Sequence, residues 1–173
     1  MSGSGSASAP VAGLIMAGGQ SRRMGGGDKS LRDLAGRPIL DRIIERVRPQ
    51  VSPVLLNANG DAARFAAYGL PVRPDLVSGF AGPLAGILTG LTWAAEAAPD
   101  CKWLASFACD APFLPLDLAA RLLSAVEREG ADLACAKSRG RSHPVFGLWP
   151  VRLREDLHQA VVEEELQIGR AHV

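Results

Sequence analysis

The sequence predicts a three-layer α/β domain in which helices cover both faces of a mostly parallel β-sheet. Short apolar runs typical of buried strands alternate with segments whose apolar residues recur at helical spacing. Glycines and carboxylates stand where the strands should end, which is where such sheets bind ligands. The 173 residues suffice for one domain over 11–166, preceded by a Ser/Gly/Ala-rich arm over 1–10 that we expect to be disordered.

The first half of the chain predicts three strands and two helices. The apolar run 11–17 closes with a glycine pair and is typical of a buried strand. Residues 38–49 carry apolar side chains at helical spacing between two prolines, which predicts a helix. A strand over 51–56, a short helix over 61–69 and a brief strand over 70–75 follow.

The second half continues the alternation. A helix is predicted from Pro83 to Ala95, and the next strand, 102–110, ends at Asp110. The remaining elements are a helix over 115–129, strand-like runs over 131–138 and 143–150, and a last helix over 151–164.

Composition excludes several classes of function. The formal net charge is +1, so no global field would recruit nucleic acid or an anionic membrane, and any anion site must be local. The first ten residues lack the basic and apolar regions of a secretory signal. The uncharged stretch 76–95 could span a bilayer by length, but its Gly, Pro and Thr residues favour a loop and a buried helix. We therefore expect a cytoplasmic protein with no nucleic-acid or membrane partner.

Three cysteines show no metal-binding or redox spacing. Cys101, Cys109 and Cys135 form no C-x-x-C motif and cannot all pair with one another. We expect them to be small buried residues in a reducing compartment.

The stretch Gly18–Lys29, GGQSRRMGGGDK, is typical of an anion-binding loop. Glycines let successive backbone N–H groups face an oxyanion, and Arg22, Arg23 and Lys29 add positive charge. The loop is not a Walker A motif, because Asp28 precedes Lys29, and it does not match G-x-G-x-x-G. It therefore indicates a different kind of phosphate binder, with a solvated turn between a strand and a helix as the alternative.

Polar residues at the other predicted strand ends suggest a metal and ligand site. Asp110 follows an apolar strand, where its carboxylate could hold Mg²⁺ while substrate phosphates supply further oxygens. Capping of the following turn is an equal alternative for Asp110. For Asn57 and Asp75, taken singly, turn chemistry is the stronger interpretation.

Several motifs taken together resemble one family. LIMAGGQSRRMGGGDKS is followed in order by LAGRPIL, NAN, RPD, GPLAGILTGL, CDAPFLPLDLAARL and HPVFGLW. This series, over residues 11–157, resembles the molybdenum cofactor guanylyltransferases, a family of nucleotidyltransferases with a Rossmann-like fold. The first motif alone is typical of nucleotidyltransferases in general, whereas GPLAG and CDAPFLP make the resemblance specific.

The resemblance implies roles for individual residues. Arg23, Lys29 and Asp110 would be the catalytic residues, the first two on the phosphates and Asp110 as the Mg²⁺ ligand. The GPLAG loop, Gly82–Gly86, would lie near the guanine. The implied nucleotide-binding residues are Met16, Ala17, Gly18, Gly19, Lys29, Asn57, Asp75 and Asp110. Met16 stands where the family has Leu, a swap of similar volume.

The implied reaction transfers GMP from GTP to the terminal phosphate of molybdenum-bearing molybdopterin and releases pyrophosphate. Such a reaction needs positioning and charge neutralisation more than a protein nucleophile, because the attacking phosphate is already anionic. The implied partners are GTP, molybdenum-molybdopterin, and the molybdoenzymes or chaperones that receive the product.

Other interpretations share part of this pattern. A cytidylyltransferase for the same cofactor, or a nucleotidyltransferase for sugar or isoprenoid phosphates, would contain the first motif. A non-catalytic GTP-binding module is the alternative from another class. His143 lies in a segment that resembles the family's part facing the pterin, but hydrogen bonding at a strand start explains it equally well.

The C-terminus departs from the family pattern. Family members continue past the last helix into a segment with an Asn-x-Asn-Thr-Pro-like motif, whereas this chain ends in EEELQIGRAHV. Because QIGRAHV reads like the translation of a sequencing adapter, we expect residues 167–173 to be a non-native tail on a truncated domain. Truncation would leave nucleotide binding possible and place catalysis in doubt.

Overall fold

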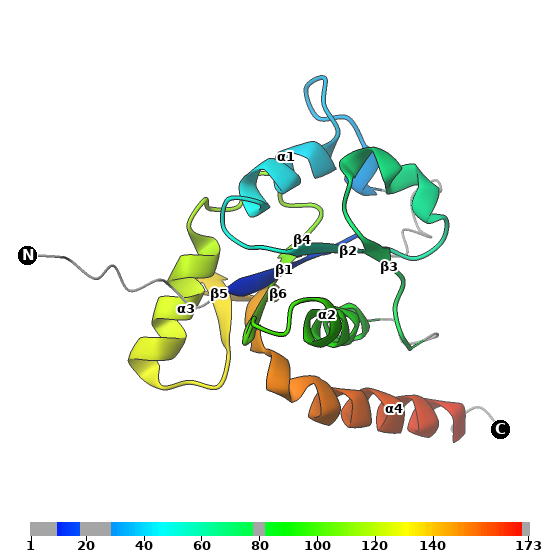
Figure 1. Cartoon of the computed structure of the whole chain (residues 1–173), viewed down its shortest axis with the longest axis vertical. Helices are drawn as coiled ribbons and strands as arrows, with labels where there is room; N and C mark the ends of the chain where they lie inside the picture. Colours follow the sequence, from blue (N-terminus) through cyan, green and yellow to red (C-terminus); the bar gives the residue numbers. More distant parts are fainter. Residues whose placement is uncertain (1–9, 18–28, 78–81, 171–173) are drawn as a thin grey trace, which may run out of the picture.

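A computed structural model describes residues 10–17, 29–77 and 82–170, with side chains up to residue 163. Within these residues six strands form one sheet between two helical layers (Figure 1), which confirms the predicted three-layer α/β fold. Of the arm expected over 1–10, Pro10 alone falls among the described residues.

The sheet is parallel through four strands and closes with an antiparallel hairpin. Its order is β3-β2-β1-β4-β6-β5. Strand β1 pairs in parallel with β2 and β4, β2 pairs in parallel with β3, and β6 runs antiparallel to both β4 and β5. The strands are β1 (Val11–Met16), β2 (Val54–Asn57), β3 (Val72–Arg73), β4 (Trp103–Ala108), β5 (Ala134–Ser138) and β6 (Arg141–Pro150).

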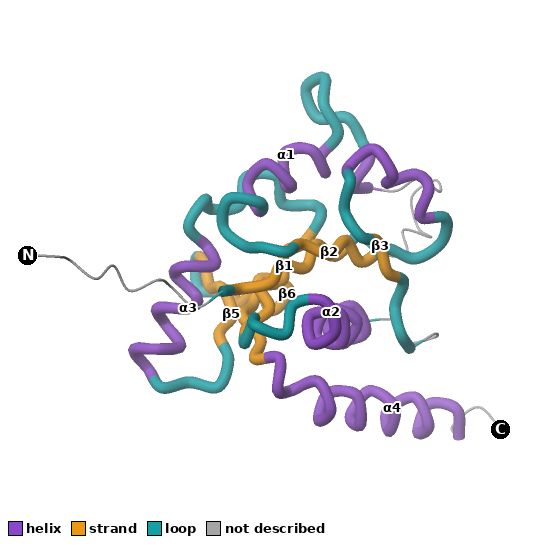
Figure 2. Tube along the Cα trace, viewed as in Figure 1, coloured by secondary structure: helices purple, strands orange, loops and turns teal. Residues whose placement is uncertain are grey.

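Helices cover both faces, as Figure 2 shows for α1 on one side of the sheet and α2 with α4 on the other. One core cluster lies between the sheet and α1, η2 and α3, and a second lies between the sheet, α2 and α4. The α-helices are α1 (Ile39–Val47), α2 (Pro83–Ala97), α3 (Leu118–Glu129) and α4 (Arg154–Arg170). The 3₁₀ helices are η1 (Lys29–Leu31), η2 (Ala62–Tyr68) and η3 (Val151–Leu153).

Several predicted boundaries were wrong. The strand expected over 51–56 begins only at Val54, and the strand expected to end at Asp110 ends at Ala108, which leaves Asp110 in a turn. The segment 61–69 forms a 3₁₀ helix, in which Asp61 Oδ1 accepts a bond from the N–H of Ala63 and Gly69 ends the turn at φ 61°. The last helix, predicted over 151–164, extends from Arg154 to Arg170, so its backbone includes residues 167–170 of the expected tail.

Helix α2 explains the long uncharged stretch. One side packs on the sheet so closely that a Cβ at Gly90 would lie 2.8 Å from side-chain atoms of Leu14 and Leu104. On its other side α2 packs against α4, which contributes Leu157 to the same core cluster. A helix covered on both sides is apolar all round, as a buried core helix should be. In the described ranges no helix has the length and apolarity needed to cross a bilayer.

The cysteines differ in accessibility, and the expectation that all three are buried holds only for Cys101, since Cys109 is half-buried and Cys135 is exposed. Cys101 is buried, and burial raises the pKa of its thiol, whereas Cys135 is exposed on edge strand β5.

A raised pKa lowers the reactive thiolate fraction, so iodoacetamide at pH 8 should modify Cys135 in the folded protein and leave Cys101 unmodified. Peptide mass spectrometry checks this. Equal labelling of both cysteines before unfolding would contradict it.

Candidate active site

The parallel strands bring most of the described site residues to one edge of the sheet. Met16 and Asn57, the last residues of β1 and β2, are in register with each other, and Met16 is also in register with Ala108 at the end of β4. Asn57 in turn pairs with Arg73 at the end of β3. The carboxyl ends of β1 to β4 therefore form the candidate site, as expected for this class of sheet.

A hydrogen-bond network joins two of the predicted residues. The side-chain amide of Asn57 donates to Asp75 Oδ1 at 3.0 Å and to the Arg73 carbonyl at 3.2 Å. Asn57 is only 2% exposed, so its position depends on these protein partners rather than on solvent. The two residues lie 18 positions apart in sequence, and the parallel β2–β3 pairing brings them together.

Asn59 belongs to the same network and was missed from the sequence. Its amide donates to Asp75 Oδ2 at 2.7 Å, and its Oδ1 accepts from the N–H of Asp75 at 2.8 Å. The available signal was the spacing of NAN, because residues two apart at a strand end project to the same side.

The first turns of α2 lie against the candidate site, on the face of the sheet that α2 covers. Gly82 caps the helix in an extended conformation and Pro83 opens it, which suits its fixed φ. Thr89 Oγ1 accepts from the N–H of Leu76 at 3.0 Å and so ties the segment after Asp75 to the helix. Gly86 stands directly over Asn57 and Met16.

A side chain at position 86 should disturb the site. A Cβ there would lie 2.6 Å from Asn57 Oδ1 and 2.9 Å from Met16 Cε, and Asn57 is held by two hydrogen bonds. Gly86→Ala should therefore destabilise the fold by about 1–3 kcal/mol and weaken nucleotide binding.

Gly90→Ala is the matched control for that change. Its Cβ would press on the ends of Leu104 and Leu14 in the same helix interface, away from Asn57. Thermal unfolding and nucleotide titration of both variants separate the two effects. A loss of nucleotide affinity in Gly90→Ala as large as in Gly86→Ala would contradict the assignment.

Lys29 and Asp110 present free charges. Lys29 is exposed at the start of η1, which packs on α1 and is anchored by the fully buried Ser30. Asp110 is exposed in the turn after β4. In the described part of the chain neither side chain forms a hydrogen bond or ion pair with a protein group, so both charges are available to a ligand.

The remaining predicted residues divide into two groups. Gly18, Gly19 and Arg23 lie outside the described residues. The Met16 carbonyl accepts from the N–H of Cys109, and the Ala17 N–H donates to the Asn57 carbonyl at 2.8 Å. These two backbone groups are thus engaged in the sheet, which narrows the backbone contacts that Met16 and Ala17 can make with a ligand.

The donor set at this edge can hold a metal only with help from a ligand. Among the described residues no three His, Cys, Asp or Glu side chains are grouped as a metal centre. A single exposed carboxylate, Asp110, nevertheless suits Mg²⁺, which commonly takes one or two carboxylate oxygens and completes its shell with phosphates and water.

His143 has a structural partner. One ring nitrogen, Nε2, lies 2.8 Å from Ser138 Oγ across the β5–β6 hairpin. This bond fits the interpretation of His143 as a hydrogen-bonded histidine near a strand start, and β6 begins two residues earlier at Arg141.

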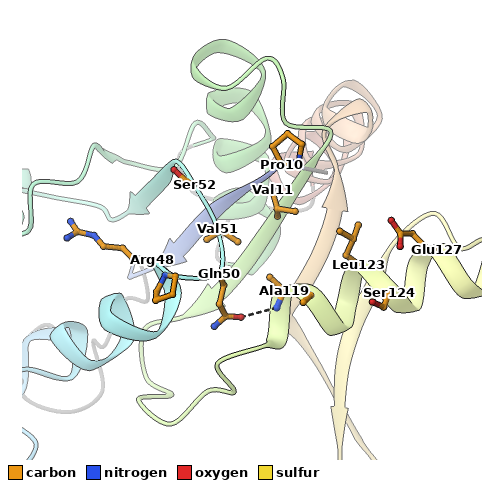
Figure 3. A pocket seen from close by; sticks show the side chains of 12 residues that line it. Pro10, Val11, Arg48, Gln50, Val51, Ser52, Ala119, Leu123, Ser124 and Glu127 are labelled. Carbon is orange, nitrogen blue, oxygen red and sulfur yellow. Dashed lines mark hydrogen bonds between the residues drawn. The ribbon is translucent and has the colours of Figure 1, made fainter. Parts of the chain in front are cut away.

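A hollow of about 540 Å³ lies at the opposite edge of the sheet (Figure 3). It is lined by residues before β1 and β2 and by α3, and Gln50 Oε1 accepts from the Ala119 N–H at its centre. It contains none of the predicted site residues, so we place the candidate site at the carboxyl edge.

A mostly parallel α/β sheet whose carboxyl edge carries an asparagine–aspartate network and, after β4, an exposed carboxylate has the architecture in which ligands bind beyond the strand ends. Residues 13–172 match the family model described as a MobA-like NTP transferase domain. The chain belongs to that family, and within it to the molybdenum cofactor guanylyltransferases.

The second assignment follows from close relatives. The chain is 60% identical over 157 residues to a molybdenum cofactor guanylyltransferase of Bradyrhizobium sp. strain ORS 278, covering 91% of this chain and 74% of the relative. It is 53% identical to another of that name from Rhodopseudomonas palustris strain BisB5, covering 89% and 73%. The fold also matches the crystal structure of molybdopterin-guanine dinucleotide biosynthesis protein A from Archaeoglobus fulgidus, with TM-score 0.68, 20% identity, and coverage of 88% and 74%.

Proposed function

We propose that this protein transfers GMP from GTP to the terminal phosphate of molybdenum-bearing molybdopterin and releases pyrophosphate. The observation that carries the proposal is the 60% identity to a relative named molybdenum cofactor guanylyltransferase. The exposure of Lys29 and Asp110 supports the proposal, because such a reaction needs a cation for the phosphates and a carboxylate that can hold a metal ion. We place the protein in the cytoplasm, with the molybdoenzymes or their chaperones as recipients of the product.

The chemistry requires little covalent work from the protein. An anionic oxygen of the acceptor phosphate attacks the α-phosphorus of GTP, and the bond from that phosphorus to the bridging oxygen breaks. The electron pair leaves with pyrophosphate, so no proton has to be removed from the nucleophile.

Charge neutralisation is then the main task of the residues. Lys29 would sit on the departing phosphates, with Arg23 as a second cation, and offset the charge that builds up there. Asp110 would hold Mg²⁺, which supplies further charge neutralisation when bound. Asn57, Asp75, and the segment Met16–Gly19 would hold the nucleoside and fix its orientation.

The test is a product assay with this chain, GTP, Mg²⁺ and molybdenum-bearing molybdopterin. We expect equal amounts of pyrophosphate and of the guanine dinucleotide form of the cofactor. Binding of GTP without either product would instead support a non-catalytic GTP-binding module. Product formation with CTP in preference to GTP would support the cytidylyltransferase interpretation.

A further inference from the structure

Both asparagines of the 173-residue chain bind the same carboxylate. Asn57 donates to one oxygen of Asp75 at 3.0 Å and Asn59 donates to the other at 2.7 Å. Asn59 also accepts from the Asp75 backbone N–H at 2.8 Å, so two hydrogen bonds join Asn59 to Asp75.

We infer that Asn59 is a positioning residue of the nucleotide site: it fixes Asp75 and, through Asp75, the orientation of the Asn57 amide. The inference rests on the proposed function for what the site binds. It assigns to Asn59 no contact with the nucleotide.

The orientation of Asn57 is determined by where its two donors go. Both point to oxygens, the Arg73 carbonyl and the Asp75 carboxylate. If the amide flipped, its carbonyl oxygen would face these two acceptors, a repulsive arrangement in a nearly buried position. Asp75 therefore holds Asn57 Oδ1 on the side of α2, where an ideal Cβ at Gly86 would lie 2.6 Å from it.

Among the residues that the structure describes, few others contact Asp75, which is why Asn59 matters. Strand β3 is only two residues long, and it pairs with β2 at Val72 and Arg73 alone. After the bond from Ala58 N–H to the Arg73 carbonyl, the chain leaves the sheet. Within the described residues, the segment that carries Asp75 is held by the contacts of Asp75 with Asn57 and Asn59 and by the bond from Leu76 N–H to Thr89.

Asn59 is well placed for this task because its own loop is fixed. Its carbonyl accepts from Arg64 Nη2 at 2.6 Å, and Gly60 follows at φ 85°, a conformation that favours glycine. Its side-chain oxygen and one amide hydrogen are both directed to Asp75. These bonds hold Asn59 in the position from which it acts on the site through Asp75.

The first experiment needs no nucleotide. With ¹⁵N in asparagine side chains alone, the protein gives two NH₂ signal pairs, and Asn59→Ala leaves that of Asn57. We expect the chemical shifts of the Asn57 pair to change and its hydrogen exchange to become about tenfold faster. The reason is that Asp75, which accepts from the Asn57 amide, is no longer held by Asn59. Asp61→Ala, which removes the cap of η2 in the same loop, should leave the pair unchanged. An Asn57 pair that is unaffected by Asn59→Ala would overturn the inference.

The second experiment measures coupling to the nucleotide. Asn59→Ala should weaken GTP binding by about tenfold, as expected for one hydrogen bond to a charged group. In an Asp75→Ala background the same change should have no further effect, because its route to the site is gone. Additive losses would overturn the inference. Asn59→Asp, which keeps size and the acceptor for the Asp75 N–H, should weaken binding at least as much as Asn59→Ala, because its carboxylate would also repel that of Asp75. It serves if the alanine variant unfolds.

Kinetics give a readout that general loosening of the fold would not. Loss of nucleotide positioning should raise KM for GTP with kcat of pyrophosphate release unchanged, and Asp61→Ala should alter neither. A raised KM in Asp61→Ala equal to that in Asn59→Ala would show a merely structural role and overturn the inference. If the unsubstituted chain binds no GTP, the proposed function fails, while the NMR experiment still decides the role of Asn59.

Discussion

Replacing Asp110 by asparagine should greatly weaken the dependence of GTP binding on Mg²⁺. The Asp110 carboxylate is exposed in the turn after β4, and it forms no ion pair with any residue of the described ranges. An amide keeps the size of the side chain but loses the charge that attracts the cation. We expect the apparent Mg²⁺ affinity of the GTP complex to fall on the order of a hundredfold.

The measurement is a GTP titration of both proteins at a series of Mg²⁺ concentrations. Asp100→Asn is a matched control, because Asp100 is also exposed but lies before β4, at the opposite end of the same strand. Its Mg²⁺ dependence should equal that of the unsubstituted protein. GTP affinity that still rises normally with Mg²⁺ in Asp110→Asn would remove Asp110 from the metal site.

Lys29→Ala should cause the second large loss, in affinity for the triphosphate. The side chain is exposed on a helical turn whose neighbour Ser30 is fully buried, so the change removes a charge without removing core packing. A charge-assisted contact contributes roughly 1.5–3 kcal/mol, so GTP binding should weaken by roughly ten- to a hundredfold.

Competition titrations with GTP and guanosine localise the effect. Guanosine carries no phosphate, so its binding should be unchanged in Lys29→Ala. Lys102→Ala, an exposed lysine before β4 at the other edge of the sheet, should bind GTP normally. Unchanged GTP affinity in Lys29→Ala would show that this lysine does not contact the phosphates.

The alternation of apolar runs with segments of helical spacing predicted the layers correctly. The reason is that the local spacing of apolar residues determines whether each segment forms a strand or a helix. Residues 83–95 and 115–129 have the apolar stripes that α2 and α3 bury. Boundaries failed where tertiary contacts decide them. Strand β4 stops at Ala108 because that is where its register with Met16 of β1 ends.

The candidate site was predictable to the extent that it follows from sheet topology. Parallel strands place Met16, Asn57 and Arg73 at one edge, so the proximity of Asn57 and Asp75 could be inferred from strand ends alone. The role of Asn59 could not, since it depends on a side-chain contact made across a two-residue strand. The contact of Gly86 with Asn57 depends on how deeply α2 packs, which no local pattern encodes.

Calorimetric titration with GTP and, separately, with CTP, each with Mg²⁺, tests the central claim most directly. Because the phosphates are common to both nucleotides, discrimination must come from the base, which the resemblance places near the Gly82–Gly86 loop. We therefore predict that GTP binds in a Mg²⁺-dependent manner and CTP binds much more weakly. Preference for CTP, or binding of neither nucleotide by a chain that circular dichroism shows to be folded, would contradict it.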